Sequence, residues 1–310
     1  MKYDFHQIVI GGGSAGLTAA SGLAGLGAKV ALVEKHRMGG DCLNYGCVPS
    51  KSFLKVAHTA KLLREAKHYG LDADYRGADI KFIMERVGRI IREIAPHDSQ
   101  ERFESLGVRV LRGTAEIVDR HTVMIDKQEK IRAKHILIAT GSKPRIPELK
   151  GLRDIDYHTN ETIFELETLP KHLIVLGGGP IGLEIGQGFR HLGSQVSIID
   201  HNNRLFPKDD AEVWDTMKRV FQEEGIDLVL GATPEEVLKD GDKFRVVLEQ
   251  KGRKTEIIGD VLLVSAGRLP DTEGLNLSRV GIKTDKRGYV ITDLLQCNFL
   301  TYCLTMIYRS

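Results

Sequence analysis

This chain of 310 residues has few cysteines, a small net charge and no long apolar run. Four cysteines are too few for a disulfide-stabilised scaffold of this length, so their spacing is more informative than their number. Lys and Arg total 44 against 42 Asp and Glu, and the formal charge of +2 provides no strong field for nucleic acid or an anionic membrane. No apolar run reaches the about 20 residues that a membrane-spanning helix requires. We therefore expect neither a nucleic-acid nor a membrane partner.

The amino terminus also lacks the features of a secretory signal, namely basic residues, an apolar core and a small-residue cleavage site. Instead, the short apolar run Ile8–Ile10 leads directly into three glycines. We therefore expect a cytoplasmic chain, and its length is typical of two domains. Glycine is abundant, at 33 of 310 residues against an average of roughly 7%. That excess indicates turns where the backbone closely approaches another group.

An internal repeat organises the sequence. The pattern G-x-G-x-x-G occurs at Gly11–Gly16 and again at Gly177–Gly182, each time directly after a short apolar strand. Each copy is followed by a helical pattern and a second apolar strand, which ends in an acid, Glu34 or Asp200, 23 residues after the first glycine. One such triplet also occurs in ordinary strand-to-helix turns. Two copies with strand, helix, strand and acid in register favour dinucleotide binding.

The chemistry of a dinucleotide explains these residue types. The first glycine allows a tight turn, the second lets backbone N–H groups approach a pyrophosphate, and the third lets the helix pack closely against the strand. The amino end of the helix stabilises the phosphate charge, and the acid accepts hydrogen bonds from a ribose hydroxyl. The repeat therefore predicts two nucleotide sites, each in a Rossmann-like α/β unit.

Hydrophobic periodicity predicts the elements around the repeat. Helices are expected at Ser52–His68 and Ile80–Phe103, the second interrupted at Pro96. The predicted strands are Val108–Leu111, Thr122–Ile125, Ile131–Ile138, Phe244–Leu248 and Val261–Val264. We assign residues 1–150 to a first nucleotide domain, 151–265 to a second, 266–296 to a return segment of the first, and 297–310 to an atypical tail.

Cys42 and Cys47 are the most informative cysteines. In an uninterrupted helix this spacing separates the Cα atoms by about 8.7 Å, more than the roughly 7 Å that a disulfide tolerates. A helix must therefore be distorted or begin between them, and Gly46 permits that break. No two further ligands lie at a spacing compatible with zinc, which leaves structural thiols or a redox-active dithiol. Lys51, one helical turn after Cys47, would favour a reactive thiolate, although a solvated surface lysine is the ordinary alternative.

The segment Gly39–Lys51 resembles the active-site segment of the flavin-dependent pyridine nucleotide-disulfide oxidoreductases, which include glutathione reductase, dihydrolipoamide dehydrogenase and mercuric reductase. The two glycine turns and the segments Ile138–Pro144 and Ala266–Asp271 extend the resemblance to roughly residues 5–296. It implies an α/β fold of two Rossmann-like domains, the first binding FAD and the second binding NAD(P)H. It also implies an oxidoreductase that passes hydride from NAD(P)H through FAD to a Cys42–Cys47 disulfide.

The same resemblance assigns roles to individual residues. Cys47 would lie against the flavin as the charge-transfer thiol, and Cys42 would be the interchange thiol that meets the substrate. Lys51 would lie near the reactive nitrogen of the flavin and pair with Glu184 across the domain boundary. These four are the predicted catalytic residues, and no metal site is expected. The predicted cofactor-binding residues are Gly11, Gly13, Ser14, Ala15, Gly16, Glu34, Gly40, Lys51, Thr140, Gly141, Gly177, Gly179, Ile181, Gly182, Asp200 and Gly267.

The choice between NAD and NADP rests on the end of the second repeated strand. Asp200 favours NAD because an acid there repels the 2′-phosphate of NADP, whereas the nearby Arg204 would accommodate that phosphate. We favour NAD. Pro180 occupies a position where several members of the family carry a tyrosine that covers the nicotinamide pocket, so no such gate is expected.

The chain departs from the family after Gln296. Members continue into a second FAD motif and an interface domain, which supplies the dimer contact and a histidine–glutamate pair for acid-base work on the thiols. Residues 297–310 do not resemble that continuation, and none of the histidines of this chain is assigned to catalysis. We therefore expect the homodimer surface to be missing, which argues against oligomerisation and against full turnover of a small-molecule or thiol/disulfide substrate. The alternative is a catalytically silent nucleotide-binding remnant or an interaction protein.

Overall fold

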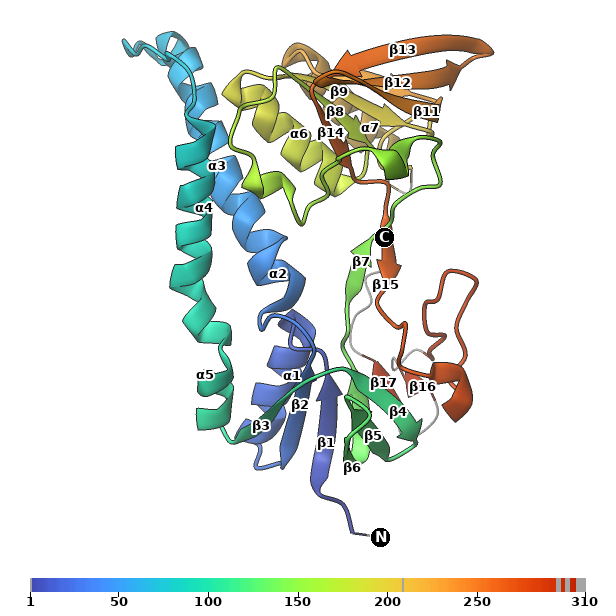
Figure 1. Cartoon of the computed structure of the whole chain (residues 1–310). Coiled ribbons are helices and arrows are strands. Elements are labelled where there is room, and N and C mark those ends of the chain that lie inside the picture. Colours follow the sequence, from blue (N-terminus) through green and yellow to red (C-terminus); the bar gives the residue numbers. More distant parts are fainter. Residues whose placement is uncertain (1, 208, 294–296, 299–301, 305–310) are drawn as a thin grey trace. The chain divides into compact units, whose positions relative to one another are not determined.

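The chain folds into two compact units (Figure 1). The computed structural model describes residues 2–207, 209–293, 297–298 and 302–304. The first unit draws on residues 1–47, 91–143 and 268–310, and the second on residues 48–90 and 144–267. The return to the first unit at residue 268 lies close to the predicted boundary at 266. The segment 48–90, by contrast, is grouped with the second unit.

A parallel sheet forms the centre of the first unit. Its strands run in the order β3-β2-β1-β6, with the bounds Val108–Arg112, Val30–Glu34, Phe5–Ile10 and Glu129–Ile138. Every residue of β2 is buried, as expected for a parallel strand that is covered on both faces. Helix α1 (Ser14–Gly25) places Leu17 and Ala20 in the core on one face. Leu275, Ile282 and Val290 belong to the core cluster on the other.

Shorter elements complete the first unit. The antiparallel hairpin of β4 (Ala115–Asp119) and β5 (Thr122–Ile125) pairs with β6. The two-residue β16 (Cys297–Asn298) pairs with β17 (Tyr302–Leu304), which joins β6 in parallel, so part of the atypical tail extends this sheet. The remaining elements are α2 (Gly40–Asn44), η2 (Ala95–Asp98), α5 (Gln100–Ser105), β7 (Ser142–Pro144), β15 (Arg268–Pro270) and η5 (Leu277–Val280).

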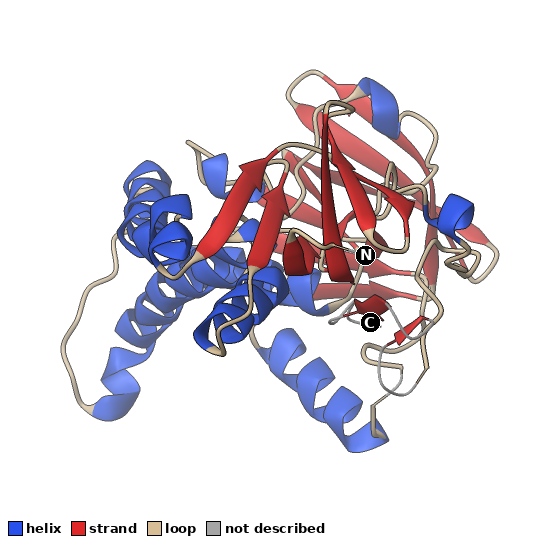
Figure 2. Cartoon of the chain, turned by 90° about the horizontal axis from the view of Figure 1, so that it is seen from below, coloured by secondary structure: helices blue, strands red, loops and turns tan. Residues whose placement is uncertain are grey.

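The second unit repeats the strand order of the first. Its parallel strands run β10-β9-β8-β14, with the bounds Asp227–Leu230, Gln195–Asp200, His172–Leu176 and Val261–Val264. In both sheets the strand before the glycine turn is flanked by the next strand in the repeat and by a strand from much later in the chain, which is the Rossmann arrangement. The prediction of two Rossmann-like α/β units is therefore confirmed. Figure 2 distinguishes the strands from the helices by colour.

Helices and an antiparallel sheet surround this second parallel sheet. Helix α6 (Pro180–Leu192) follows the second glycine turn, and Pro180 is at its amino end, as is usual for proline. The antiparallel sheet is formed by β11 (Ala232–Asp240), β12 (Lys243–Gln250) and β13 (Arg253–Gly259). The remaining elements are α3 (Cys47–Glu65), η1 (Ala66–Tyr69), α4 (Ile80–Ile94), η3 (Leu152–Asp154), η4 (Ile163–Glu165) and α7 (Ala211–Glu223).

Helices α3 and α6 pack closely at a glycine. The rings of Phe53 and Phe189 lie 4.8 Å apart between centroids, and both side chains are fully buried. A Cβ on Gly188 would overlap the ring of Phe53, so only glycine allows this approach. Burying an aromatic side chain removes a large apolar area from water. This contact therefore anchors α3 to α6.

The predicted helix Ile80–Phe103 is divided into three pieces in the structure. Helix α4 ends at Ile94, a 3-10 turn contains Pro96, and α5 begins after Ser99. The interruption predicted at Pro96 is thus confirmed, because proline cannot donate the helical hydrogen bond. The hydroxyl of Ser99 accepts a hydrogen bond from the N–H of Arg102, which starts the new helix.

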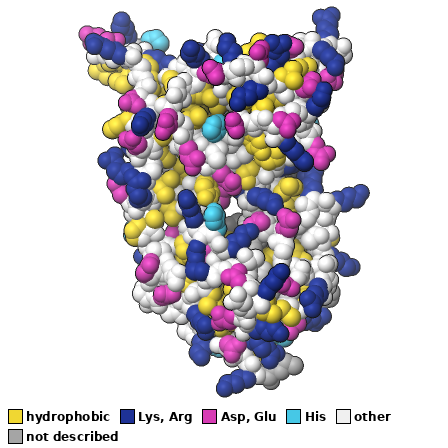
Figure 3. Space-filling view, viewed as in Figure 1, with side chains coloured by type: hydrophobic (Ala, Val, Ile, Leu, Met, Phe, Trp, Pro, Cys, Tyr) yellow, Lys and Arg dark blue, Asp and Glu magenta, His cyan; other side chains and the backbone are white. Residues whose placement is uncertain are grey.

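Charges of both signs are intermixed on the face of the molecule seen in Figure 3, in agreement with the small formal charge of +2. Within the described residues, every helix is too short or too polar to cross a lipid bilayer.

Candidate active site

The first glycine turn is built by close backbone approaches. Gly11 has a φ of +110°, and a Cβ on it would overlap the carbonyl oxygen of Ala139, which follows β6. A Cβ on Gly16 would overlap the carbonyl oxygen of Gly11 itself. A positive φ and such short approaches both require glycine. The turn therefore brings the amino end of α1 directly against the ends of β1 and β6.

The second glycine turn reproduces this geometry. Gly177 has a φ of +115°, and a Cβ on it would overlap the carbonyl oxygen of Ser265, which follows β14. A Cβ on Gly182 would overlap the carbonyl oxygen of Gly177. The repeat seen in the sequence therefore extends to individual backbone contacts, which supports equivalent binding chemistry at the two turns.

The acids at the ends of β2 and β9 bind the backbone of their own turns. Glu34 Oε2 accepts a hydrogen bond of 2.6 Å from the N–H of Gly12, and Asp200 Oδ2 accepts one of 2.6 Å from Gly178. The other carboxylate oxygen of Glu34 accepts from the N–H of His36, and that of Asp200 accepts from the N–H and the side-chain amide of Asn202. A carboxylate has about four lone-pair sites, so about two remain at Glu34 and about one at Asp200 for a ribose hydroxyl. The sequence did not indicate that these acids also hold the glycine turns.

Unused hydrogen-bonding groups surround the first turn. The hydroxyl of Thr140 is buried, and it has no hydrogen-bond partner in the part of the chain that the structure describes. Gly13, the residue before α1, has no side chain to cap the first N–H groups, and the first turn of α1 contains no acid. Buried hydroxyls and uncapped helix ends bind anionic ligands readily. The residues present therefore fit the pyrophosphate of a dinucleotide.

The loop that carries the cysteines touches this turn through its backbone. The N–H of Gly39 donates a 2.8 Å hydrogen bond to the carbonyl oxygen of Gly12. A Cβ on Gly40 would lie 2.6 Å from the Cα of Gly13. Both approaches depend on glycine, since Gly39 and Gly40 have positive φ angles. Cys42 is thus only two residues after Gly40, which directly contacts the first glycine turn.

The helix break predicted between the cysteines is confirmed. Helix α2 ends at Asn44, and α3 begins at Cys47, so the two cysteines lie on separate helices. Cys42 is half-buried and Cys47 is exposed. The break removes the uninterrupted helical geometry that would have prevented a disulfide between them.

Two functional candidates were missed in the sequence. Asp41 directly precedes Cys42, and its Oδ1 lies 3.2 Å from an Nη atom of Arg268. Arg268 also donates from Nε to the hydroxyl of Ser142 at 2.7 Å. These three residues come from distant parts of the chain, so no spacing rule relates them. The available signal was only that each belongs to one of the segments that resemble the family.

Lys51 and Glu184 are predicted to pair beside the flavin. Both side chains are exposed, both belong to the second unit, and the ion pairs of the described residues do not include one between them. Glu184 is the fifth residue of α6, just beyond its first turn. Their pairing beside a flavin remains a prediction.

The other predicted cofactor residues occupy turns and helix starts. Gly141 and Gly267 adopt positive φ angles of +69° and +112°. A Cβ on Gly179 would meet no atom within 4 Å, so the space in front of α6 is open. Ser14 and Ala15 lie in the first turn of α1, and Ile181 lies in that of α6. Arg204, the residue that would favour NADP, donates a hydrogen bond to the carbonyl oxygen of Pro207 at 3.0 Å.

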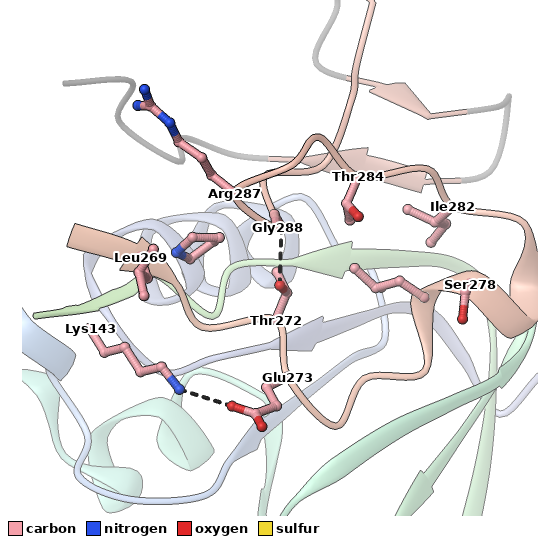
Figure 4. Close-up of a pocket in the computed structure, with 11 residues that line it drawn as sticks. Lys143, Leu269, Thr272, Glu273, Ser278, Ile282, Thr284, Arg287 and Gly288 are labelled. Atoms are coloured by element: carbon pink, nitrogen blue, oxygen red, sulfur yellow. Dashed lines mark hydrogen bonds and ion pairs between the residues drawn. The ribbon is translucent and has the colours of Figure 1, made fainter. Parts of the chain in front are cut away.

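A cavity of about 410 Å³ lies elsewhere in the first unit (Figure 4). Its walls include Lys143, whose ammonium lies 3.0 Å from the carboxylate of Glu273, and Thr272, whose hydroxyl donates to the carbonyl oxygen of Gly288. The residues that line it do not include the glycine turns or the cysteines. The predicted chemistry therefore does not depend on this cavity.

A polar cluster joins α3 to α6 in the second unit. Glu224 lies 2.6 Å from the ammonium of Lys61 and 3.0 Å from Nε2 of His191, and it accepts a hydrogen bond from Gln187. Burial raises the pKa of Glu224, but the hydrogen bonds from Lys61 and Gln187 outweigh it and leave the pKa below its usual value. The hydrogen bond to Glu224 raises the pKa of Lys61. Burial lowers the pKa of His191 against the opposing charge of Glu224.

Comparisons with known proteins identify the family of the chain. A family model described as pyridine nucleotide-disulphide oxidoreductase matches residues 5–298. The chain is 35% identical over 290 residues to a mercuric reductase of Staphylococcus aureus, covering 94% of this chain and 53% of the relative. It is 34% identical over 308 residues to a dihydrolipoamide dehydrogenase of Chaetomium thermophilum, covering 94% of this chain and 59% of the relative.

A solved structure supports the same fold. The HOCl-induced flavoprotein disulfide reductase RclA from Escherichia coli superimposes with a TM-score of 0.83 at 25% sequence identity. The match covers 96% of this chain and 65% of that chain. This chain spans about half the length of the mercuric reductases that it matches.

Proposed function

This chain belongs to the pyridine nucleotide-disulphide oxidoreductase family, and on that premise we propose that it moves reducing equivalents from a nicotinamide dinucleotide, through FAD, to the Cys42–Cys47 pair. The observation that carries the proposal is the backbone contact between the cysteine loop and the first glycine turn, from Gly39 to Gly12 and from Gly40 to Gly13. A nucleotide bound at that turn would therefore lie next to the loop that carries Cys42.

The residues of the chain supply binding and orientation. A flavin held there would supply hydride acceptance and two-electron transfer, by which the Cys42–Cys47 disulfide would take up two electrons and two protons and its S–S bond would break to give two thiols. The N–H groups at the start of α1 would bind the FAD pyrophosphate, and the buried Thr140 hydroxyl would donate to the same ligand. The start of α6, preceded by the open space at Gly179, binds the nicotinamide dinucleotide. The acceptor beyond the thiols is a small molecule or a disulfide.

We favour NAD over NADP at the second turn. Asp200 lies at the end of β9, where its charge repels a 2′-phosphate, and the guanidinium of Arg204 is directed to the carbonyl oxygen of Pro207. The Arg204 guanidinium, which would favour NADP, is therefore hydrogen-bonded within its own loop.

Flavin retention and reduction test the proposal. The purified or FAD-reconstituted protein should be yellow and should bleach when NADH is added without oxygen. A colourless protein that cannot be reconstituted would instead identify a catalytically silent remnant. Reconstitution with FAD distinguishes a weakly held cofactor from an absent site.

The roles of the two cysteines are separated by matched serine variants. A thiolate next to flavin produces a long-wavelength charge-transfer band in the partly reduced protein. The band should be lost in Cys47→Ser and kept in Cys42→Ser. A band that survives in Cys47→Ser would show that another residue lies against the flavin.

A further inference from the structure

The ion pair between Asp41 and Arg268 places two opposite charges at the cysteine loop. Asp41 directly precedes Cys42, and a Cβ on Gly46 would lie 3.0 Å from its Oδ2. Gly46 in turn directly precedes Cys47. The carboxylate of Asp41 therefore lies against the break between α2 and α3, adjacent in sequence to one thiol and in space to the residue before the other.

Arg268 is held in place by more than this carboxylate. Its Nε donates to the Ser142 hydroxyl at 2.7 Å, and an Nη atom donates to the Ser142 carbonyl oxygen at 2.7 Å. Its own carbonyl oxygen accepts a hydrogen bond from the hydroxyl of Tyr289. The Arg268 side chain is only 19% exposed, against 44% for Asp41. The guanidinium is thus a fixed positive charge that meets the cysteine loop through Asp41.

We propose that Asp41 and Arg268 act as a positioning pair that sets the reactivity of Cys42 and Cys47 by balancing opposite charges beside them. A positive charge near a thiol favours the reactive thiolate, and a negative charge disfavours it. Asp41 supplies the negative charge next to Cys42, and Arg268 supplies the positive charge that pairs with it. The inference rests on the proposed function only in taking Cys42 and Cys47 as the reacting thiols.

The balance predicts opposite effects for the two charge-removing variants. Arg268→Gln removes the positive charge and should slow alkylation of the reduced thiols at neutral pH by about threefold. Asp41→Asn removes the negative charge and should speed it by about threefold. The factors are modest because water and salt screen charges near the surface. The double variant should return close to the unchanged protein, whereas a merely structural role would move both single variants in the same direction.

The measurement follows each thiol separately. The reduced full-length chain is treated with iodoacetamide at a series of pH values, then cleaved after Tyr45, which separates Cys42 from Cys47, and analysed by mass spectrometry. Relative to the unchanged protein, the rate profile of Arg268→Gln should move to higher pH and that of Asp41→Asn to lower pH. No flavin or NADH is needed, so this result is independent of whether the flavin is reduced.

Lys143→Gln is the matched control. It removes the same charge from the residue next to Ser142, but the Lys143 ammonium pairs with Glu273 rather than with the cysteine loop (Figure 4). Its alkylation rates should equal those of the unchanged protein. The proposal is overturned if Lys143→Gln reproduces the effect of Arg268→Gln, or if the two single variants shift in the same direction. Should Arg268→Gln fail to fold, unchanged or slower alkylation in Asp41→Asn overturns it as well.

Discussion

The third glycine of the first turn provides the sharpest test of the fold. In Gly16→Ala, the new methyl group would overlap the carbonyl oxygen of Gly11 and lie 3.3 Å from Cγ1 of Val9, which is fully buried. The carbonyl cannot easily withdraw, because the N–H of Gly11 is hydrogen-bonded to Val33 at 2.8 Å and the strand beneath is in the core. Helix α1 must therefore move away from β1.

The magnitude follows from the cost of overpacking. Inserting a methyl group into a tight interior destabilises a protein by about 1–3 kcal/mol, and a clash with backbone places Gly16→Ala near the upper end, at about 3 kcal/mol. Gly22→Ala is the matched control in the same helix, since a Cβ there meets no atom within 4 Å. Alanine is the better helix former, so this control should be stabilised by about 0.5–1 kcal/mol.

Hydrogen exchange measured by mass spectrometry separates the two variants. Peptides from β1 (Phe5–Ile10) and α1 should exchange much faster in Gly16→Ala and slightly more slowly in Gly22→Ala. FAD retention should fall in Gly16→Ala alone, because the displaced helix no longer presents its first N–H groups to the pyrophosphate. Equal protection of β1 in both variants would refute the close helix–strand contact, and with it the structural reason for the third glycine.

Two further predictions concern the second unit. Glu224→Gln should destabilise it by about 1–2 kcal/mol at pH 7, because Lys61 loses the carboxylate at 2.6 Å and keeps only that of Glu65 at 3.9 Å, whereas Glu223→Gln, which changes the neighbouring exposed acid, should have little effect. The pKa of Glu224 and the pKa of His191 are both lowered in the folded chain. Each group therefore contributes stability above its unfolded pKa, which is about 4.5 for Glu and 6.5 for His. That stability is lost as the pH falls through the lower pKa of the folded chain. The difference between Glu224→Gln and the unchanged protein should therefore shrink once the pH has fallen well below 4.5 and Glu224 itself is protonated, as followed by urea unfolding with Trp214 fluorescence; a difference that persists there undiminished would contradict this assignment. At the nucleotide site, NADH should bind at least about tenfold more tightly than NADPH, because like charges meet at Asp200; titration calorimetry of Asp200→Asn should show a smaller ratio, and a preference for NADPH in the unchanged protein would exclude the choice of NAD.

The parts of the fold that local patterns determine were predictable from the sequence. Both glycine turns, their strands and the final acids depend on residues within about 25 positions of each other, and their Rossmann order follows from that repeat. The break between Cys42 and Cys47 was predictable because disulfide geometry forbids the uninterrupted helix. Strands β11 and β13 were missed, because Pro234 and a bulge interrupt the first and most side chains of the second are exposed.

The contacts that the sequence could not show join distant segments. Arg268 meets Asp41 and Ser142 only after the chain has folded, and nothing in their spacing signals it. The sequence also did not show that Glu34 and Asp200 accept hydrogen bonds from the N–H groups of Gly12 and Gly178. The motif predicts a ligand contact for each acid and no backbone contact. The predicted tail, residues 297–310, is described only at β16 and β17. Its residues 299–301 and 305–310 lie outside the described residues.

The hydrogen bonds from Gly12 to Glu34 and from Gly178 to Asp200 have a thermodynamic consequence for ligand affinity. Each nucleotide loop is preorganised by its own acid before any ligand arrives, so little conformational entropy remains to be lost on association. Under the proposed function, replacing either acid would therefore loosen the loop as well as remove the proposed ribose contact, and the resulting affinity loss would combine both effects.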